Sequence, residues 1–313
     1  MITTVSTGVL QTNRNIARSS MLAYAKDRIV FGQYAKAYEL KSHEGDTYTW
    51  FRPQQLGVAL TSLEDGVTPS GATMGFDKVT CSVSQYGNFM LYTDKVNTIP
   101  EVKLMDIGAK LLGENMALTL DVLHRNNLNT NASTVIYASN AANTAAITTS
   151  QVFSQNDVKR IRRKLTRNVA PRISGGAGGS GKYVMIAHPD IEYDALEIAA
   201  FLQTSYYQSK ENIASGDLPP IFAIQVEFST IGTIKAGAGA SGQDIYRSYI
   251  FGEEAFGGVD IKDLQASMIY KPFGSGGTTD ALNQRATQGW KDACGQAILN
   301  GNWLVAYECS ATA

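Results

Sequence analysis

The fold is decided by two consecutive stretches: residues 45–94, GDTYTWFRPQQLGVALTSLEDGVTPSGATMGFDKVTCSVSQYGNFMLYTD, and residues 98–126, TIPEVKLMDIGAKLLGENMALTLDVLHRN. The segments Thr47–Arg52 and Lys78–Gly87 are rich in β-branched and aromatic residues and predict two strands. The turn-rich tip Leu63–Pro69 lies between them. An isolated two-stranded ribbon is only marginally stable in water. We therefore expect a subunit whose arm is completed by neighbouring molecules.

The second stretch predicts the longest helix of the chain, from Ile99 to about Arg125. Thr98–Glu101 has the capping-box pattern, with a proline in the first turn. Two apolar stripes follow at helical spacing: Val102, Met105, Ala109, Leu112, Met116 and Leu123, and then Leu104, Ile107, Leu111, Leu118 and Val122. Two stripes predict burial on more than one side, so the helix is expected to pack between layers. Gly108 and Gly113 in its interior indicate a close backbone approach there.

The remaining chain predicts a mixed α and β protein. Residues 1–40 are expected to form a partly helical arm, and residues 126–156 a polar linker. Strand-like and helix-like segments alternate between about 131 and 259, which indicates a small α/β region. The C-terminal part is expected to be β, with a strand over 266–270 and a hairpin over 296–307.

Two short signals place individual elements within this outline. A helix is expected to begin near Asp157, with Val158, Ile161 and Leu165 on its apolar side. The pair Asn300–Gly301 suits a primed turn and predicts the C-terminal hairpin.

Composition excludes several broad classes of protein. Net charge is −1 and charged residues make up 18% of the chain, so no global basic field holds nucleic acid. Three cysteines without Cys-x-x-Cys spacing predict reduced thiols and neither a disulfide framework nor a metal site. No signal peptide and no membrane span are expected, because the N-terminus lacks a basic start and no apolar run approaches about 20 residues.

Two glycine-rich loops resemble nucleotide-binding motifs but stand in the wrong context. Gly176–Lys182 matches most of a P-loop, yet Tyr183 follows the lysine and a strand follows the loop. Gly237–Gly242 matches G-x-G-x-x-G, yet it lies between two strand-like runs and is expected to connect a hairpin. His188, before Pro189, is expected to pack or cap at a strand end. We expect no enzyme, no catalytic residue and no cofactor.

The helix over residues 157–167 carries the main cluster of charge. Its polar side holds Lys159, Arg160, Arg162, Arg163, Lys164 and Arg167. We expect this side to be solvated or to pair with acidic residues of an adjacent subunit, with nucleic-acid contact as the alternative. Glu64 and Asp65 at the hairpin tip, with Glu253 and Glu254, are the candidate acidic partners.

The order of these parts resembles the major capsid proteins of tailed bacteriophages, in particular the family typified by the capsid protein of phage N-four. The resemblance covers about residues 30–311. The matching segments are Leu63–Pro69, Ser84–Gly87 ahead of Tyr92–Asp94, Tyr183–Asp190, Gly252–Phe256 and Gly289–Lys291.

The resemblance implies an α+β fold, the Hong Kong ninety-seven-type phage capsid fold, with an N-terminal arm, an extended β-hairpin E-loop, a spine helix, a peripheral domain and an axial domain. The implied division is residues 1–40 for the N-terminal arm and 41–97 for the E-loop. The peripheral domain takes 98–130 and 260–313, and the axial domain takes 131–259.

The function implied by the resemblance is that of a major capsid protein. Copies would self-assemble as hexamers and pentamers into the icosahedral shell that encloses the phage double-stranded DNA. Separate scaffolding protein, portal and a cement or decoration protein are the implied partners, together with non-specific contact with packaged DNA. Assembly would take place in the bacterial host cytoplasm, and the product would be part of the virion, with no membrane contact.

Three alternatives remain open at this stage. An encapsulin-like cellular nanocompartment shares the implied fold, a nucleotide-binding enzyme would use Gly176–Lys182, and a nucleic-acid binder would use the basic helix. For the capsid hypothesis we expect the inter-subunit contacts to include seven residues: Glu64, Asp65, Gly66, Pro69, Arg160, Arg163 and Arg167.

Overall fold

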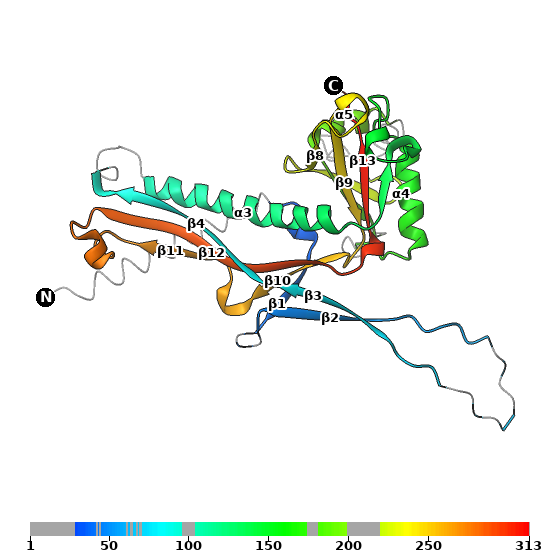
Figure 1. The fold of residues 1–313 in the computed structure, drawn as a ribbon, viewed down its shortest axis with the longest axis horizontal. Coiled ribbons are helices and arrows are strands. Elements are labelled where there is room, and N and C mark those ends of the chain that lie inside the picture. The colour runs from blue at the N-terminus through cyan, green and yellow to red at the C-terminus, as the bar shows by residue number, and fades with distance from the viewer. Residues whose placement is uncertain are drawn as a thin grey trace, which may run out of the picture.

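The computed structural model has three visible parts: a long helix lying along a sheet, a compact lobe at one end of that helix, and an extended two-stranded arm (Figure 1). The structure describes residues 29–41, 43, 45–60, 62, 65, 66, 68, 71–95, 104–173, 181–198 and 220–312. The predicted N-terminal arm up to residue 28 and the capping box at 98–101 lie outside these residues. The predicted mixture of helix and strand is confirmed.

The first sheet has five strands and forms the elongated part of the molecule. Its members are β1 (Lys36–Leu40), β4 (Ser84–Thr93), β10 (Phe256–Ile261), β11 (Ser267–Lys271) and β12 (Arg285–Ile298). The long strand β12 pairs antiparallel with β4, β10 and β11, and β1 adds to β10 in parallel. The predicted strand over 266–270 is confirmed within one residue.

Helix α3 (Leu104–Asn131) covers one face of this sheet (Figure 1). Leu112, Met116 and Ala117 are buried against Trp290 of β12, and Tyr86 and Met90 of β4 pack around them. The helix ends six residues beyond the predicted Arg125, so part of the predicted linker is helical. A close approach does occur at Gly108, but side chains make it and not a backbone, because an added Cβ atom there would overlap with the Tyr92 hydroxyl.

The lobe contains the second sheet, of six strands. They are β5 (Val135–Tyr137), β6 (Tyr183–Ala187), β7 (Ile224–Phe228), β8 (Thr233–Lys235), β9 (Ile245–Phe251) and β13 (Leu304–Cys309). Every residue of β6 and β13 is buried, because both faces of the sheet are covered. One face packs under α4 (Gln155–Arg167) and α5 (Glu192–Leu196), and the other packs against Phe31 and Leu128.

Helix α4 confirms the predicted amphipathic helix over the basic segment. Ser154 caps its N-terminus by accepting a hydrogen bond from the Asp157 amide, and Val158, Ile161 and Leu165 are buried. The opposite side of the helix carries the basic residues, so the helix is strongly amphipathic.

The third part is the arm formed by β2 (Thr47–Pro53) and β3 (Phe76–Ser82), which pair only with each other. Eight short 3-10 turns connect the described elements: η1 (Gly32–Tyr34), η2 (Ala138–Asn140), η3 (Thr144–Ala146), η4 (Pro189–Ile191), η5 (Ala240–Gly242), η6 (Lys262–Leu264), η7 (Gly277–Asp280) and η8 (Gly301–Trp303).

The predicted C-terminal hairpin is wrong. Strand β12 belongs to the five-stranded sheet and β13 to the six-stranded sheet, so the chain crosses between sheets at Asn300. The Asn300 side chain accepts a hydrogen bond from the Asn302 amide and caps the turn η8, so a 3-10 turn replaces the primed turn.

The two sheets divide the chain differently from the predicted domain boundaries at two places. Residues 84–93, assigned to the arm by the boundary at 97, pair along their whole length with β12. Strand β13, assigned to the peripheral part by the boundary at 260, lies between β5 and β9 in the lobe.

Candidate assembly surfaces

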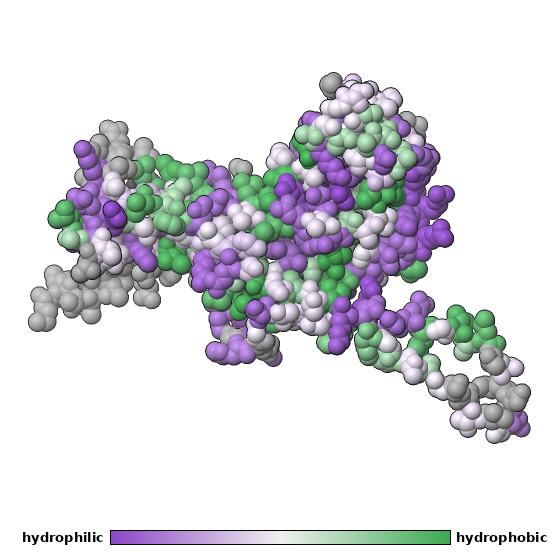
Figure 2. All heavy atoms as spheres, viewed as in Figure 1, coloured by the Kyte–Doolittle hydropathy of each residue, from purple (hydrophilic) through white to green (hydrophobic). Residues whose placement is uncertain are grey.

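The distal part of the arm exposes apolar side chains that touch little of the chain itself. Val58 and Leu60 are 81% and 88% exposed, and Leu56, Met74 and Phe76 are exposed as well. Figure 2 shows this apolar surface on the arm, which projects away from the rest of the molecule. Unburied aliphatic residues at such a density mark an interaction surface.

The root of the arm, in contrast, is fixed. The ring centroids of Tyr38, Tyr48 and Trp50 lie 4.8–5.6 Å from one another, and they pack with Val259 and Ala297 of the five-stranded sheet. Aromatic pairs at these separations add to the stability gained by burial. The arm is therefore held at one end and projects from there.

Two of the predicted contact residues lie at the tip of the arm. Asp65 and Gly66 are exposed in a turn, and Gly66 has a φ of +75°, which favours glycine. Glu64 and Pro69 lie outside the described residues. The tip presents the Asp65 carboxylate to solvent, beyond the exposed apolar residues Val58 and Leu60.

Helix α3 has a second exposed apolar surface, on the side that faces away from the sheet. Ile107, Leu111 and Leu118 are 38–46% exposed, although the two stripes predicted burial on both sides. Only the stripe containing Ala109, Leu112 and Met116 is buried within the described chain. The predicted packing between two layers is therefore absent from the single described chain.

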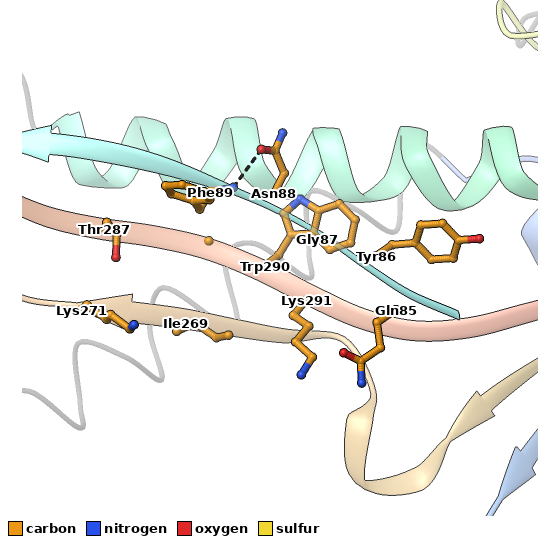
Figure 3. Close-up of a pocket in the computed structure, with 11 residues that line it drawn as sticks. Gln85, Tyr86, Gly87, Asn88, Phe89, Ile269, Lys271, Thr287, Trp290 and Lys291 are labelled. Atoms are coloured by element: carbon orange, nitrogen blue, oxygen red, sulfur yellow. Dashed lines mark hydrogen bonds between the residues drawn. The ribbon is translucent and has the colours of Figure 1, made fainter. Parts of the chain in front are cut away.

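The open face of the five-stranded sheet contains a trough of about 510 Å³ (Figure 3). Gly87 and Gly289 form its floor, and Cβ atoms there would come within 2.7 Å of the Trp290 carbonyl oxygen and of Phe89 Cβ. The glycines allow the strands to approach and leave the floor of the trough free of side chains. Phe89 and Ile269 supply exposed apolar walls, and Lys271 and Lys291 line it as well.

A shallow basic groove of about 690 Å³ lies along α4. Its lining residues are Lys159, Arg162, Arg163, Thr166, Arg167, Arg172 and Phe222, none of which is acidic. The Lys159 ammonium lies 5.3 Å from the centroid of the Phe222 ring, a cation–π contact. The groove therefore combines positive charge with an aromatic side chain, and it suits an acidic partner that also carries apolar groups.

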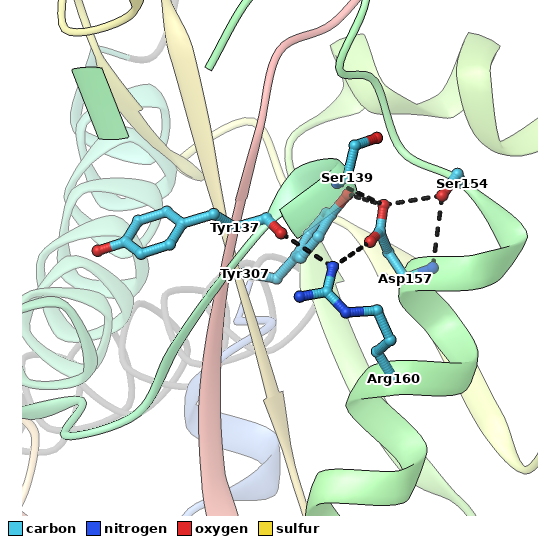
Figure 4. A network of polar contacts seen from close by, with 6 residues as sticks. All are labelled: Tyr137, Ser139, Ser154, Asp157, Arg160 and Tyr307. Carbon is cyan, nitrogen blue, oxygen red and sulfur yellow. Dashed lines mark hydrogen bonds and ion pairs between the residues drawn. The ribbon is translucent and has the colours of Figure 1, made fainter. Parts of the chain in front are cut away.

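The three predicted arginines are used differently. Arg160 donates to the buried Asp157 carboxylate at 2.7 Å and to the Tyr137 carbonyl oxygen at 3.1 Å (Figure 4). Arg163 and Arg167 are exposed in the basic groove, and no described acidic side chain lies within ion-pair distance of them. Arg163 and Arg167 are therefore available to a second molecule, whereas Arg160 is committed within the lobe.

One of the four acidic candidates is also used within the chain. The Glu254 carboxylate lies 2.9 Å from the Lys36 ammonium, where it ties the start of β1 to the loop before β10. Neither Glu253 nor Glu254 has a described contact with α4.

The structural context excludes the two nucleotide motifs. Residues 237–242 connect β8 and β9, which pair antiparallel, so the predicted hairpin connection is confirmed and no helix follows the glycines. Ile173 and Lys182 pair antiparallel around the first glycine loop, and Lys182 leads directly into β6. A phosphate-binding helix N-terminus is therefore missing at both described flanks.

The histidine prediction is confirmed. His188 follows β6, and its Nδ1 atom accepts a hydrogen bond from the Asp190 amide at 3.3 Å, which caps η4. No cluster of three or more potential metal ligands occurs among the described residues. None of the helices in the described ranges is long and apolar enough to cross a membrane.

Comparison with solved structures gives the fold family. No family model and no curated protein sequence matches the chain. The capsid of Ralstonia phage GP4 matches with a TM-score of 0.72 and 14% identity, covering 91% of both chains. The cyanophage Pam1 capsid matches with a TM-score of 0.71 and 13% identity, covering 88% of both chains. The chain therefore has the Hong Kong ninety-seven-type phage capsid fold.

An encapsulin also matches, with a lower TM-score than these two phage capsids. The holo-SrpI encapsulin of Synechococcus elongatus PCC 7942 has a TM-score of 0.55 and 10% identity, covering 90% of this chain and 86% of the encapsulin. The narrower resemblance to the phage N-four family stays a prediction.

Proposed function

We propose that the chain is the major capsid protein of a tailed bacteriophage, which assembles as hexamers and pentamers into an icosahedral shell around double-stranded DNA. One observation carries the proposal. The chain shares its fold with a phage capsid over about nine-tenths of its length, and the apolar residues of its projecting arm are not buried by the rest of the chain.

The parts of the fold take the roles that this function requires. The arm at about 41–97 serves as the E-loop, and residues 1–40 as the N-terminal arm. The peripheral domain is built on α3 with 98–130 and 260–313, and the axial domain on 131–259. By sheet membership we move residues 84–93 to the peripheral domain and β13 to the axial domain.

Assembly is driven by burial of the exposed apolar surfaces. Val58 and Leu60 on the arm, Leu111 on α3 and Phe89 in the trough are exposed apolar side chains that a neighbouring copy would bury. Each buried aliphatic or aromatic side chain contributes roughly 1.5–3 kcal/mol. A copy that covers its neighbours with both the E-loop and the N-terminal arm buries more surface than a standard interface of about 1,600 Å².

Charged residues then set the register between copies. Asp65 and Gly66 at the tip, with Glu64 and Pro69 beside them in sequence, and Arg163 and Arg167 on α4 are the proposed contacts. Arg160, which the sequence also predicted as a contact, is left out because it binds Asp157 and Tyr137 within the lobe. Exposed ion pairs contribute at most about 1 kcal/mol each, so they select an orientation and do not drive association.

The proposed partners follow from the same function. Separate scaffolding protein, portal and a cement or decoration protein complete the particle, and packaged DNA touches the inner surface without sequence preference. The subunit is assembled in the bacterial host cytoplasm and remains in the virion as a structural protein, not as an enzyme.

An encapsulin-like nanocompartment is the alternative, supported by the likeness to an encapsulin over 90% of this chain. The capsids of Ralstonia phage GP4 and cyanophage Pam1 give higher TM-scores than the encapsulin, so the viral function is preferred.

Expression of the full chain, followed by negative-stain microscopy, tests the proposal. We expect closed shells or capsomers with five- or six-fold symmetry. Shells recovered from infected cells should contain nuclease-protected double-stranded DNA. Shells filled with a protein cargo would support the encapsulin alternative, and a monomer at all concentrations would refute both.

A further inference from the structure

We infer that the basic groove on α4 binds the outer face of α5 in a second copy of the chain, and that this contact joins neighbours around a ring. The inference rests on the proposed function, because it names which two surfaces meet within a capsomer. The basic groove is the seven-residue surface described above, and Lys159, Arg163, Arg167 and Phe222 are among its lining residues.

The outer face of α5 has the composition that the basic groove lacks. Ile191, Asp194, Ala195 and Ile198 are turned into the lobe and buried. Glu192, Tyr193, Leu196 and Glu197 therefore form the outward side, because residues four apart lie on the same side of a helix. Tyr193 and Leu196 are 59% and 47% exposed. We call these four residues the acidic face.

The two surfaces complement each other in both charge and apolar character. The acidic face places two carboxylates beside Tyr193 and Leu196, and the basic groove places several cations beside Phe222. Neither Glu192 nor Glu197 has an ion-pair partner among the described residues. Charge around a small apolar centre is the arrangement that selects one partner and one orientation.

The two surfaces do not pair within one copy, because no described ion pair joins Glu192 or Glu197 to α4. Figure 1 places α5 beside the C-terminus at one end of the lobe and α4 along its side. A contact between two different patches on identical chains is head-to-tail, and it closes into a ring when the rotation permits. Rings of five and six copies are the units that the proposed shell requires.

A phosphate backbone would satisfy the cations of the groove but leave its apolar part uncovered. The net charge of −1 also gives the whole chain no attraction for nucleic acid. A protein partner that carries both carboxylates and apolar side chains fits the described groove better, so the inference commits to a second copy.

Charge reversal on each side, alone and combined, tests the contact. Arg163→Glu with Arg167→Glu, and separately Glu192→Lys with Glu197→Lys, should each raise the concentration for half-maximal assembly about tenfold, because attraction becomes repulsion. Combining all four substitutions should restore that concentration to within about threefold of wild type. Lys262→Glu, an exposed reversal away from both surfaces, is the matched control.

The measurement combines light scattering for the assembled fraction with circular dichroism and thermal melting for the fold. Where a reversal lowers the melting temperature, the neutral variants Arg163→Gln with Arg167→Gln and Glu192→Gln with Glu197→Gln should give the same ordering with smaller changes. Assembly of the single-side variants at the wild-type concentration would overturn the inference. The inference would also be overturned if the combined variant did not recover assembly. A gel-shift measurement with a DNA duplex gives the last test: if the arginine variants lost DNA binding but assembled normally, the groove would be a nucleic-acid surface.

A cysteine pair separates this inference from the proposed function. In an Arg167→Cys/Glu197→Cys variant, oxidation should give a ladder of crosslinked chains up to five or six copies on denaturing gels, whether or not closed shells form. The native cysteines at 81, 294 and 309 are buried, so the parent chain is the control and should give no ladder. If shells form but no crosslinked ladder appears, the contact between α4 and α5 is rejected and the capsid function is not. If a ladder appears but no shells form, the capsid function is rejected and the contact is not.

Discussion

The hydroxyl group of Tyr92 on β4 occupies the space that a side chain at Gly108 of α3 would need. Tyr92 also donates a hydrogen bond to Gln288 on β12, with 3.1 Å between the oxygen atoms. This contact brings the helix down onto β12, which is central in the five-stranded sheet, and onto its neighbour β4.

Replacing Gly108 should therefore destabilise the chain although alanine is the better helix former. Gly108→Ala gains about 1 kcal/mol of helix propensity, but overpacking costs about 1–3 kcal/mol, and here the overlap is with a fixed ring. We expect a net loss of about 1–2 kcal/mol in the free energy of unfolding, measured by denaturant titration of the unassembled chain.

The double variant identifies the cause of that loss. Tyr92→Phe removes the overlapping oxygen, so Gly108→Ala should cost less in the Tyr92→Phe background than in the wild type. Equal costs in the two backgrounds would show that the hydroxyl group does not limit the approach.

The buried carboxylate of Asp157 should be the most sensitive polar position in the lobe. Asp157 is fully buried and accepts hydrogen bonds from Arg160 at 2.7 Å, Tyr307 at 3.1 Å and Ser154 Oγ at 2.8 Å (Figure 4). Asp157→Ala leaves the Arg160 cation half-buried without its partner, and we expect a loss of about 3–5 kcal/mol in unfolding free energy.

Two further variants calibrate the Asp157 measurement. Tyr307→Phe should cost about 1–2 kcal/mol, because one hydrogen bond to a charged group is lost. Arg163→Ala, on the exposed side of the same helix, should change stability by less than about 0.5 kcal/mol. A loss below 1 kcal/mol for Asp157→Ala would contradict the importance of the network.

The local elements could be predicted from the sequence where one segment determines its own structure. The amphipathic pattern of 157–167, the β-rich runs around Trp50 and Val79, and the glycine connection at 237–242 all gave the observed elements. The overall fold was predicted from the order of short motifs that resemble phage capsid proteins, and the comparison of structures confirms it.

The sequence predictions were wrong where contacts with distant segments determine the structure. Asn300–Gly301 has the composition of a primed turn, but β12 is already paired with β4, some two hundred residues earlier, and β13 with β9. Hydrophobic periodicity likewise cannot distinguish burial in the core from burial against another molecule. The stripe through Leu111 predicted a second packed layer, and it is exposed in the described chain. The outer face of α5 was missed because only the burial pattern separates its outward residues from its inward ones.

A group of carboxylates near the root of the arm should make stability depend on pH. Burial, with the nearby Asp292 and Glu39 carboxylates, raises the pKa of Asp260 to about 6. An aspartate in the unfolded chain titrates near about 3.9, so the folded state binds more protons between about pH 4 and pH 6. Stability contributed by this group is therefore lost as the pH rises through that window.

Asp260→Asn should remove this dependence. At pH 7.5 the variant should be more stable than the wild type by on the order of 1 kcal/mol, since solvent screens a partly buried group. The difference should vanish at pH 4, where Asp260 is protonated in the wild type. Asp65→Asn at the exposed tip removes the same charge and should not change the pH profile. A constant difference at all pH values would assign the effect to packing rather than to titration.

The apolar residues of the distal arm should affect assembly but not folding. Val58 and Leu60 are almost fully exposed, so Val58→Ser with Leu60→Ser removes little from the folded monomer, and its unfolding free energy should change by less than about 0.5 kcal/mol. Burying these two side chains against a neighbour contributes about 1.5–3 kcal/mol each, so the concentration for half-maximal assembly should rise at least about tenfold. Leu112→Ala, in the core under α3, should show the opposite pattern and cost about 2–5 kcal/mol of monomer stability. If the serine variant instead melts early and assembles normally, the arm folds onto its own chain, and the surface it exposes is not the one that joins the copies.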